Sequence, residues 1–268
     1  MKLYFSPGAC SLSPRIALLE AGLPFDTQKV DTKTKQMEGG GDFWTINSKG
    51  YVPVLQLDSG DMLTEGPAIV QYIADQKPES GLAPKAGTLE RYRLQEWLNF
   101  ITSEVHKGFS PLFDPTTPAD AKQGFKDKLG KRFDWLSLQL AGKSYLMGDT
   151  FTVADGYLFT VLNWGQWVGI DIAKWPVLKD YQARVAARPK VQEALKAEGL
   201  IKSTPAAAMH LRGSRSARSI TPLESGPCKH CPHFLSHTDP PCTRSMPARR
   251  ANRGPRWRKR CRCRRQCW

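Results

Sequence analysis

Cys10 and His106 are the two side chains in the first 202 residues that are best suited to thiol chemistry. This part of the sequence has no other cysteine or histidine, although the whole chain has seven cysteines and five histidines. A cysteine thiolate is a strong nucleophile, and an imidazole can donate or accept a proton near neutral pH. We therefore predict a thiol-dependent enzyme. The competing structural interpretation is a cysteine that packs in a turn as a small hydrophobic side chain.

The segment around Cys10 predicts that its sulfur lies at the N-terminus of a helix. Residues 3–5 have a strand pattern, residues 6–9 form a turn with Pro and Gly, and residues 12–21 have a helix pattern that ends at Gly22. Unpaired backbone N–H groups and the positive end of the helix dipole stabilise an anion at such a position. We therefore expect the Cys10 pKa to lie below its ordinary value of about 8.5.

Strand and helix patterns alternate through residues 1–77. After the first strand and helix, the predicted elements are a strand at 25–30, a helix, hairpin strands at 54–57 and 62–64, and a helix at 68–74. A βαβ half followed by a ββα half resembles the thioredoxin-like fold, with a four-stranded mixed sheet. Such domains keep a cis proline before the third strand, so we expect the Val52–Pro53 bond to be cis.

Residues 78–87 form a polar linker with Pro and Gly, and the strand pattern does not return after it. Tyr92, Trp97, Phe100 and Ile101 mark a long first helix, and later helices are predicted at 119–140, 153–167, 176–187 and 191–197. Thr152 and Asp155 have the spacing of a capping box. We therefore predict an α+β chain, with a thioredoxin-like domain at 1–77 and an all-α domain at 88–202.

The net charge of +14 is carried almost entirely by residues 203–268. This segment has 15 Lys or Arg but only two acidic residues, Glu224 and Asp239. The near-neutral remainder is typical of a cytoplasmic enzyme, and its single cysteine is consistent with a reducing compartment. No apolar run approaches the roughly 18 residues that a membrane span needs, and nothing at the N-terminus indicates export. We predict a cytoplasmic protein without a membrane association.

Residues 203–268 begin abruptly, without helix or strand periodicity, and hold six cysteines. Three interpretations are open. The segment could be a frameshift or read-through product, a zinc site, or a basic arm that binds nucleic acid non-specifically. In the second interpretation, the zinc ligands would be Cys228, Cys231, His233 and His237. We favour the first interpretation, and we expect disorder in this segment and no metal in the protein.

Several motifs together resemble the glutathione S-transferases. They are Tyr-Val-Pro-Val at 51–54, Thr-Glu-Gly-Pro-Ala-Ile at 64–69 and Thr-Val-Ala-Asp at 152–155. Ser-Pro-Gly-Ala-Cys-Ser at 6–11 and Glu-Val-His-Lys at 104–107 resemble more narrowly the bacterial beta class, of the kind found in aromatic-pollutant degradation. That class has a cysteine where other classes use tyrosine or serine. The resemblance covers residues 1–202 and implies a homodimer that uses glutathione as co-substrate, in detoxification and xenobiotic degradation.

The resemblance also implies where glutathione binds. Its cysteinyl backbone pairs with Val52 beside Pro53, and its γ-glutamyl end is held by Glu65 and Gly66. Further implied contacts are Lys35 for the glycyl carboxylate, Tyr51, Asn99 from the neighbouring subunit, Ser103 and Lys107. Many relatives carry serine where this chain has Gly66, so we expect backbone amides to provide more of the anchoring here.

The implied catalytic groups are Cys10, Ser11 and His106, which stabilise the thiolate of glutathione so that it can attack a hydrophobic electrophile. The electrophile pocket is predicted from the aromatic side chains of the helical half, Phe109, Phe113, Trp164 and Trp167. Aromatic or halogenated electrophiles would suit such a pocket. The resemblance to family members that act in aromatic-pollutant degradation implies reductive dehalogenation of chlorinated aromatics as a further activity.

Two other functions remain open. The first is a glutathione-dependent thiol-disulfide transferase or peroxidase in which Cys10 carries the covalent step. Because Ser13 stands where a Cys-x-x-Cys motif would place its second thiol, that route would need a second glutathione. The other is a non-catalytic binding protein with the transferase fold, which would fail to bind glutathione.

Overall fold

Four short strands form a mixed sheet in the N-terminal part of the chain, in a computed structural model that describes residues 1–202. They are β1 (Lys2–Phe5), β2 (Asp26–Lys29), β3 (Val54–Gln56) and β4 (Met62–Thr64), in the spatial order β2-β1-β3-β4. Strand β1 pairs in parallel with β2 and antiparallel with β3, and β3 pairs antiparallel with β4. The predicted sheet is confirmed. The interpretations of residues 203–268 lie outside the described residues.

Strand β1 lies inside the sheet because its apolar side chains are buried on both faces. Leu3 packs in the main core and stands opposite Leu55, whereas Tyr4 packs on the other face and stands opposite Val54. Such alternation fixes the register, because a shift by one residue would exchange the two faces. The turn that carries Cys10 therefore leaves the sheet in a defined direction.

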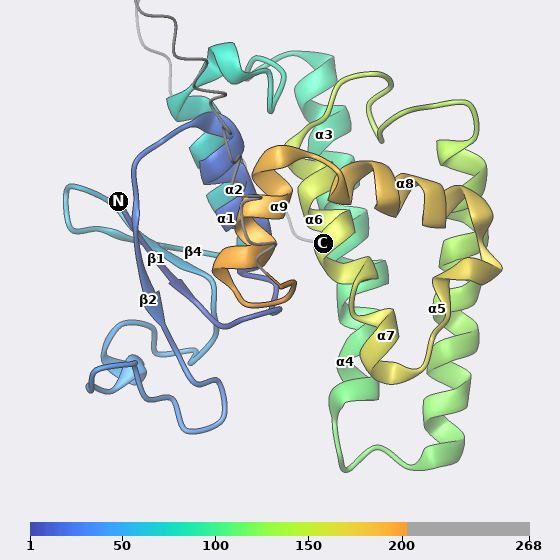
Figure 1. Cartoon of the computed structure of the whole chain (residues 1–268), viewed down its shortest axis with the longest axis horizontal. Coiled ribbons are helices and arrows are strands. Elements are labelled where there is room, and N and C mark those ends of the chain that lie inside the picture. The colour runs from blue at the N-terminus through green and yellow to red at the C-terminus, as the bar shows by residue number, and fades with distance from the viewer. Residues whose placement is uncertain (203–268) are drawn as a thin grey trace, which may run out of the picture. The chain divides into compact units, whose positions relative to one another are not determined.

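Helices α1 (Leu12–Ala21) and α2 (Gly66–Gln76) lie between the sheet and the helical half of the molecule (Figure 1). As the sequence predicts, α1 ends at Gly22, which has a left-handed φ of 66° and donates its N–H to the last turn. The helix expected between β2 and β3 is only a 3₁₀ turn, η1 (Phe43–Thr45), which is capped by the Asp42 side chain.

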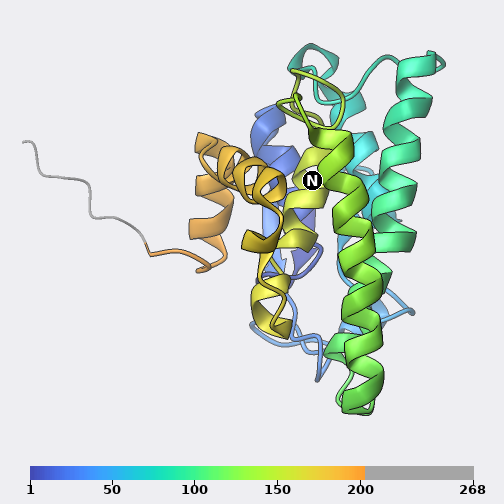
Figure 2. The same cartoon turned by 90° about the vertical axis from the view of Figure 1, so that its right-hand side faces the viewer.

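From residue 78 to residue 202 the chain is helical, as predicted. Its elements are η2 (Pro78–Ser80), α3 (Leu89–Phe100), η3 (Ile101–His106), α4 (Lys107–Phe113), α5 (Ala119–Leu140), α6 (Val153–Leu162), α7 (Gly165–Val168), η4 (Ile172–Lys174), α8 (Pro176–Ala186) and α9 (Pro189–Ala197). Figures 1 and 2 together show α5 on the side of the helical half that faces away from the sheet. The other helices bridge the space between α5 and α1.

Two helices differ from the sequence-based prediction. The helix expected over residues 153–167 ends at Leu162 and is followed by the separate turn α7. Gly165, the first residue of α7, lies close to the backbone that follows α7, because an added Cβ would lie 2.8 Å from the carbonyl oxygen of Ile170. Gly165 also accepts the Ile170 N–H at 2.9 Å, so the chain folds back here. The predicted long first helix passes through a π-helical segment, η3.

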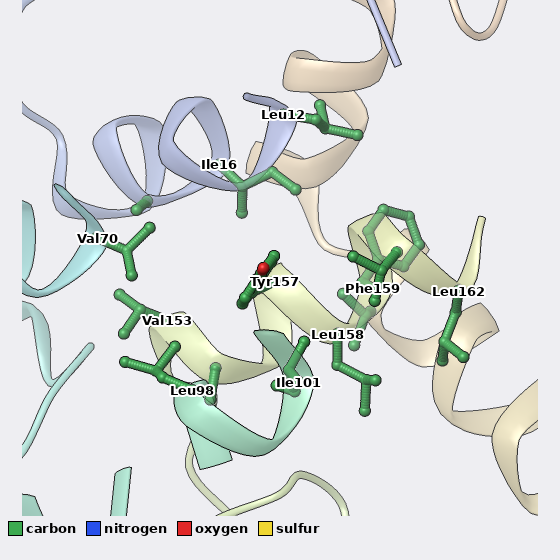
Figure 3. Close-up of a cluster of buried hydrophobic side chains, with 14 of the residues drawn as sticks. Leu12, Ile16, Val70, Leu98, Ile101, Val153, Tyr157, Leu158, Phe159 and Leu162 are labelled. Carbon is green, nitrogen blue, oxygen red and sulfur yellow. The ribbon is translucent and has the colours of Figure 1, made fainter. Parts of the chain in front are cut away.

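Helix α6 is the centre of the core. Every residue from Val153 to Leu162 is buried, as expected for a helix that is apolar on all sides. Figure 3 shows Ile16 of α1 and Ile101 of η3 on opposite sides of Tyr157, which belongs to α6. One continuous hydrophobic cluster therefore joins the sheet half to the helical half, and residues 1–202 belong to one compact unit.

Asp155 fixes the start of α6. Its carboxylate accepts the N–H of Thr152 at 2.8 Å, the N–H of Leu146 at 2.9 Å and the hydroxyl of Tyr181 at 2.9 Å. The predicted capping box is confirmed. The Asp155 carboxylate also links the preceding loop to α6 through Leu146, and α8 to α6 through Tyr181. A capping box alone would not make these contacts.

The domain bounds 1–77 and 88–202 stay predictions, because residues 1–202 pack as one unit. Within this part of the chain, none of the helices is both long enough and apolar enough to cross a membrane.

Candidate active site

Two adjoining cavities lie between the sheet half and the helical half, and Cys10 and His106 line both. The first has a volume of about 460 Å³, and its lining includes the Val52–Pro53 segment and several polar and charged residues, among them Lys49, Glu65 and Lys107. The second, of about 480 Å³, has an aromatic wall. Folding thus brings together a cysteine and a histidine that are 96 residues apart in the sequence.

Cys10 lies in the turn between β1 and α1, directly before the helix, as predicted. Its thiol donates a hydrogen bond to the carbonyl oxygen of Val52 at 3.3 Å. The expectation of a lowered pKa is wrong. Burial raises the pKa of Cys10 to about 11, because the loss of hydration outweighs the backbone N–H groups and the positive charge of Lys107. At neutral pH, Cys10 is therefore a thiol that can donate a hydrogen bond.

The turn before Cys10 is held by side chains of the helical half. The N–H of Gly8 donates to Glu198 at 2.8 Å, and the carbonyl oxygen of Gly8 accepts the indole N–H of Trp164 at 2.9 Å. Glu198 is itself paired with Arg15 at 2.9 Å, and both side chains are almost fully buried. Gly8 has a φ of 72°, and an added Cβ would lie 2.6 Å from Trp167. Only glycine fits this position.

Ser11 stabilises the same turn from within. Its hydroxyl accepts the N–H of Ser6 and donates to the carbonyl oxygen of Ser6, both at 3.1 Å. The side chain is fully buried and lines neither cavity. The Ser11 hydroxyl is thus occupied within the turn, and the predicted stabilisation of a thiolate by the backbone N–H groups around Cys10 and Ser11 stays a prediction.

The Val52–Pro53 peptide bond is cis, as predicted. Both residues line the first cavity, together with the largely exposed Tyr51. The Tyr51 carbonyl oxygen accepts the side-chain amide of Asn47 at 2.7 Å, which anchors the segment. Within residues 1–202, the N–H of Val52 makes no hydrogen bond. It is therefore available to a ligand.

Glu65 and Gly66 form the N-terminus of α2 at the edge of the first cavity. Glu65 has a φ of 68°, which is strained for a residue with a side chain and is a feature often found at functional sites. Its carboxylate pairs with the ammonium group of Lys49, which also donates to Thr64 at 3.1 Å. The first N–H groups of a helix lack partners within it, so this end of α2 favours an anion.

Lys35 lines the second cavity, beside Tyr51. Its ammonium group donates to the carbonyl oxygen of Gly50 at 2.8 Å and lies 5.9 Å and 5.8 Å from the ring centres of Trp44 and Tyr51. The predicted contact with a carboxylate is compatible with this position and stays a prediction.

Three predicted contacts lie on the helical rod formed by α3, η3 and α4. Lys107 lines the first cavity. Asn99 and Ser103 do not line either cavity; they are exposed one helical turn apart, and the Ser103 hydroxyl donates to the Asn99 carbonyl oxygen at 3.0 Å. Contacts between these two residues and glutathione therefore stay predictions.

Phe113, Trp164 and Trp167 form the predicted aromatic wall of the second cavity. Phe109 does not, and that prediction is wrong. Its ring is fully buried between the rings of Phe133 and Trp164, with centres 6.3 Å and 5.7 Å away. Helical spacing alone could not separate this core position from the lining positions.

His106 closes the π-helical segment η3 and faces Tyr157 of α6. Its Nδ1 lies 2.6 Å from the Tyr157 hydroxyl oxygen, and its ring meets Trp164 edge-on at 4.8 Å between centres. Burial lowers the pKa of His106 to about 4, and the neighbouring charge of Lys107 acts in the same direction. The imidazole is therefore neutral at physiological pH.

Sequence profiles of known domains match both halves of the chain. The profile "Glutathione S-transferase, N-terminal domain" matches residues 8–76, and "Glutathione S-transferase, C-terminal domain" matches residues 100–189. Glutathione S-transferase GstA of Escherichia coli O157:H7 is 44% identical over 200 residues, which cover 75% of this chain and 100% of the relative. The chain belongs to the glutathione S-transferase family.

Comparison with solved structures indicates to which class within this family the chain is similar. A bacterial beta-class glutathione S-transferase of Sphingomonas chungbukensis has 52% sequence identity and a TM-score of 0.73, and the match covers 75% of this chain and 100% of that one. A sphingomonad glutathione S-transferase in complex with glutathione has 51% identity, with the same TM-score and coverage. The predicted resemblance to the beta class and the predicted transferase fold are confirmed.

The sequence-based reasoning missed several residues that line the first cavity of this transferase fold. They are Asn47, Lys49, Thr64, Pro67, Thr102, Ser110 and Tyr157. Lys49 carries no local signal, because a lysine after an asparagine and a serine is typical of a solvated loop. Tyr157 does carry one. A tyrosine hydroxyl in a mainly apolar helix needs a hydrogen-bond partner, and His106, the single histidine of residues 1–202, was one candidate.

Proposed function

We propose that this protein conjugates the thiolate of glutathione to hydrophobic electrophiles. The observation that carries the proposal is the pair of adjoining cavities, one polar and one aromatic, that meet at Cys10 and His106. A polar cavity suits a charged tripeptide, and an aromatic cavity suits an apolar co-substrate. The junction is where a sulfur atom and an electrophilic carbon would have to meet.

Glutathione would bind to the polar cavity by extending the chain segment at Val52. The Val52 N–H is free to donate to the cysteinyl carbonyl, and the Val52 carbonyl can accept the cysteinyl N–H. This second bond displaces the Cys10 thiol, which now donates to that carbonyl. The displaced S–H is then available to the sulfur of glutathione.

The γ-glutamyl end would bind at the N-terminus of α2. The backbone N–H of Gly66 and the positive end of the helix dipole favour its carboxylate, and the Glu65 carboxylate can accept its ammonium group. The existing Lys49–Glu65 pair is largely exposed to solvent, so exchanging its partner costs little. Lys107 lies in the same cavity and adds positive charge near the sulfur.

The thiolate of glutathione would be stabilised by neutral donors. Cys10 is a thiol at neutral pH, and His106 is a neutral imidazole. Both can donate a hydrogen bond to an anionic sulfur in a partly dry cavity, where such bonds are stronger than in water. The thiolate then forms the carbon–sulfur bond, and the leaving group departs with its electron pair.

The test compares the full chain with its Cys10→Ala variant. We expect calorimetry to detect glutathione binding to both proteins, and we expect conjugation of 1-chloro-2,4-dinitrobenzene to fall without vanishing. A reaction that proceeds through a Cys10–glutathione disulfide would be abolished in the variant. Failure of the unaltered chain to bind glutathione would contradict the proposal and favour a non-catalytic binding protein.

Reductive dehalogenation is the finer proposal for chlorinated aromatics. One glutathione thiolate replaces chloride on the ring carbon, and a second thiolate attacks the sulfur of that conjugate. The products are glutathione disulfide and a ring carbanion, which takes up a proton. The wall of Phe113, Trp164 and Trp167 supports this class of substrate because aromatic rings pack favourably on one another. Release of chloride with one glutathione disulfide per chloride would support it, and conjugate alone would contradict it.

A homodimer in the cytoplasm is the proposed state of the protein. An exposed aromatic cluster on α3 and α5 supports the dimer, because the rings of Trp97 and Phe100 both contact Trp135, which is 41% exposed. Asn99 and Ser103 lie on the same helical rod, next to this cluster. Sedimentation equilibrium should give twice the mass of the chain, and a monomer at micromolar concentration would contradict the dimer.

A further inference from the structure

Tyr157 is the only described residue that makes a hydrogen bond with the imidazole of His106. The Tyr157 oxygen lies 2.6 Å from Nδ1 of His106, and the two rings meet edge-on with centres 5.9 Å apart. Tyr157 belongs to the buried helix α6, whose position is fixed by the core on all sides. A histidine partner on such an element holds the imidazole in one orientation.

Among residues 1–202, the hydrogen of the Tyr157 hydroxyl has two possible acceptors within reach. One is Nδ1 of His106 at 2.6 Å, and the other is the Thr102 hydroxyl oxygen at 3.4 Å. Thr102 uses its own hydrogen on the carbonyl oxygen of Leu98 at 2.8 Å. If Nδ1 carried the ring hydrogen, the Tyr157 hydrogen would be left with the long contact to Thr102 or with solvent in the first cavity, which Tyr157 lines. The distances therefore favour donation from Tyr157 to Nδ1.

The other ring nitrogen, Nε2, is free. It makes no hydrogen bond with residues 1–202, and it is not among the buried polar atoms that lack a partner, so it is open to the cavities that His106 lines. A neutral imidazole that accepts at Nδ1 must carry its hydrogen on Nε2. The ring is neutral at physiological pH, as described above, and burial also keeps Tyr157 protonated by raising its pKa.

We propose that Tyr157 is a positioning residue that holds His106 as the Nε2–H tautomer, so that this imidazole always presents a donor to the sulfur of glutathione. The inference rests on the proposed function, in which His106 donates to the thiolate. The opposite tautomer would present a bare nitrogen to an anion, which is repulsive.

The π-helical segment η3 brings Thr102 and His106 to the same Tyr157 hydroxyl. A π-helix makes one extra residue fit into a turn and so rotates the side chains that follow it. Thr102 near the start of η3 and His106 at its end both contact the Tyr157 hydroxyl. This geometry gives the segment a role in the site, since π-helical turns are rare and frequent at functional positions.

The first test reads the tautomer directly in the full chain, without glutathione. The protein is labelled with ¹⁵N-histidine, and the His106 signals are identified by their loss in a His106→Gln variant. We expect the nitrogen shifts of a protonated Nε2 and of a bare, hydrogen-bonded Nδ1. A protonated Nδ1 would overturn the inference whatever the outcome of any activity measurement.

The second test removes one oxygen atom with Tyr157→Phe. We expect the ¹⁵N spectrum to show loss of the Nδ1 hydrogen bond and a mixture of tautomers, and we expect kcat for conjugation to fall about tenfold or more. The Kd for glutathione should stay within about twofold, since the anchoring groups at Val52 and Glu65 are unchanged. An unchanged tautomer or an unchanged kcat would overturn the inference.

Tyr145→Phe is the matched control, because the Tyr145 hydroxyl also takes part in a side-chain hydrogen bond, accepting from Arg188 at 3.3 Å, but lies outside both cavities. It should leave kcat and the His106 spectrum unchanged; an equal fall in kcat would mean that Tyr157 acts only through stability. If the unaltered chain neither binds glutathione nor conjugates it, the proposed function fails, whereas the tautomer measured in the free chain still decides the structural part of this inference.

Discussion

At the scale of single residues, the two cavities meet at Cys10 and His106, and burial keeps both of these side chains uncharged at neutral pH. The sequence predicts the position of Cys10 correctly, because a strand, a Pro-Gly turn and a helix follow one another locally. It predicts the wrong direction for the Cys10 pKa, because desolvation comes from residues such as Val52 that only the fold brings near. The same holds for Phe109, whose burial depends on α5 and Trp164. Local sequence therefore gives a group's place but not its environment.

The raised pKa of Cys10 leads to a prediction about its reactivity. Alkylation by iodoacetamide requires the thiolate, so the rate at Cys10 should rise with pH towards a midpoint of about 11. Mass spectrometry of the Cys10 peptide at a series of pH values measures this rate. Free glutathione in the same mixture is the control, with a midpoint of about 8.5. A Cys10 midpoint below that of free glutathione would contradict the thiol assignment.

The lowered pKa of His106 predicts a loss of stability in mild acid. The folded state binds a proton only near pH 4, whereas the unfolded chain binds it near 6.5, so the unfolded state takes up more protons between these values. The free energy of unfolding should therefore fall as pH decreases through this window, by up to about 3 kcal/mol from this group. Urea unfolding of the chain and of His106→Gln at pH 7 and pH 5 isolates the contribution. Equal pH dependence of the two proteins would contradict the assignment.

At the scale of elements, the strands and most helices follow from local patterns, and the exceptions have identifiable causes. The hairpin around residues 58–61 and helix α5 are predicted at the observed positions. The π-helical segment η3 has no local sequence signature, because its extra residue per turn is stabilised by contacts with Tyr157 and the core. The break between α6 and α7 was not predicted, and the turn that ends α7 is closed by a local contact between Gly165 and Ile170.

The cap of α6 is expected to be the most sensitive element boundary. Asp155→Ala removes the acceptor of two buried N–H groups and of the Tyr181 hydroxyl, so the free energy of unfolding should fall by about 2–4 kcal/mol. Chemical denaturation measures this change. Thr88→Ala, which removes the more exposed cap of α3, is the control and should cost about 1 kcal/mol. A smaller effect at Asp155 than at Thr88 would be inconsistent with the cap described here.

At the scale of the whole molecule, the site exists only because the two halves share one core. Helix α6 packs against α1 and α2 as well as against the helical half, and the end of α9 reaches back to the Cys10 turn. The motifs predict that Cys10 and His106 meet, through the family resemblance and not through any local signal. The hydrogen bonds of Gly8 with Glu198 and Trp164, here called the Gly8 clamp, could not be predicted, because both partners lie more than 150 residues from Gly8 in the sequence.

The Arg15–Glu198 pair is expected to couple stability to the geometry of the site. Glu198→Ala leaves the Arg15 guanidinium buried without its partner and frees the Gly8 N–H, so the free energy of unfolding should fall by about 3–5 kcal/mol. The exposed pair Lys190–Glu193 is the control, and Glu193→Ala should cost less than about 1 kcal/mol. Urea unfolding measures both variants. Similar small losses in the two variants would argue against the clamp.

The central claim is that this cleft binds glutathione with its sulfur beside Cys10 and His106 and stabilises the thiolate there. The most direct test is the pKa of the bound glutathione thiol, followed by the ultraviolet absorbance of the thiolate in a titration of the full chain. The same titration with S-methylglutathione, which has no ionisable thiol, subtracts the signal of the protein. We predict a bound pKa clearly below the ordinary value of about 8.5. A bound pKa at or above that of free glutathione would contradict the account.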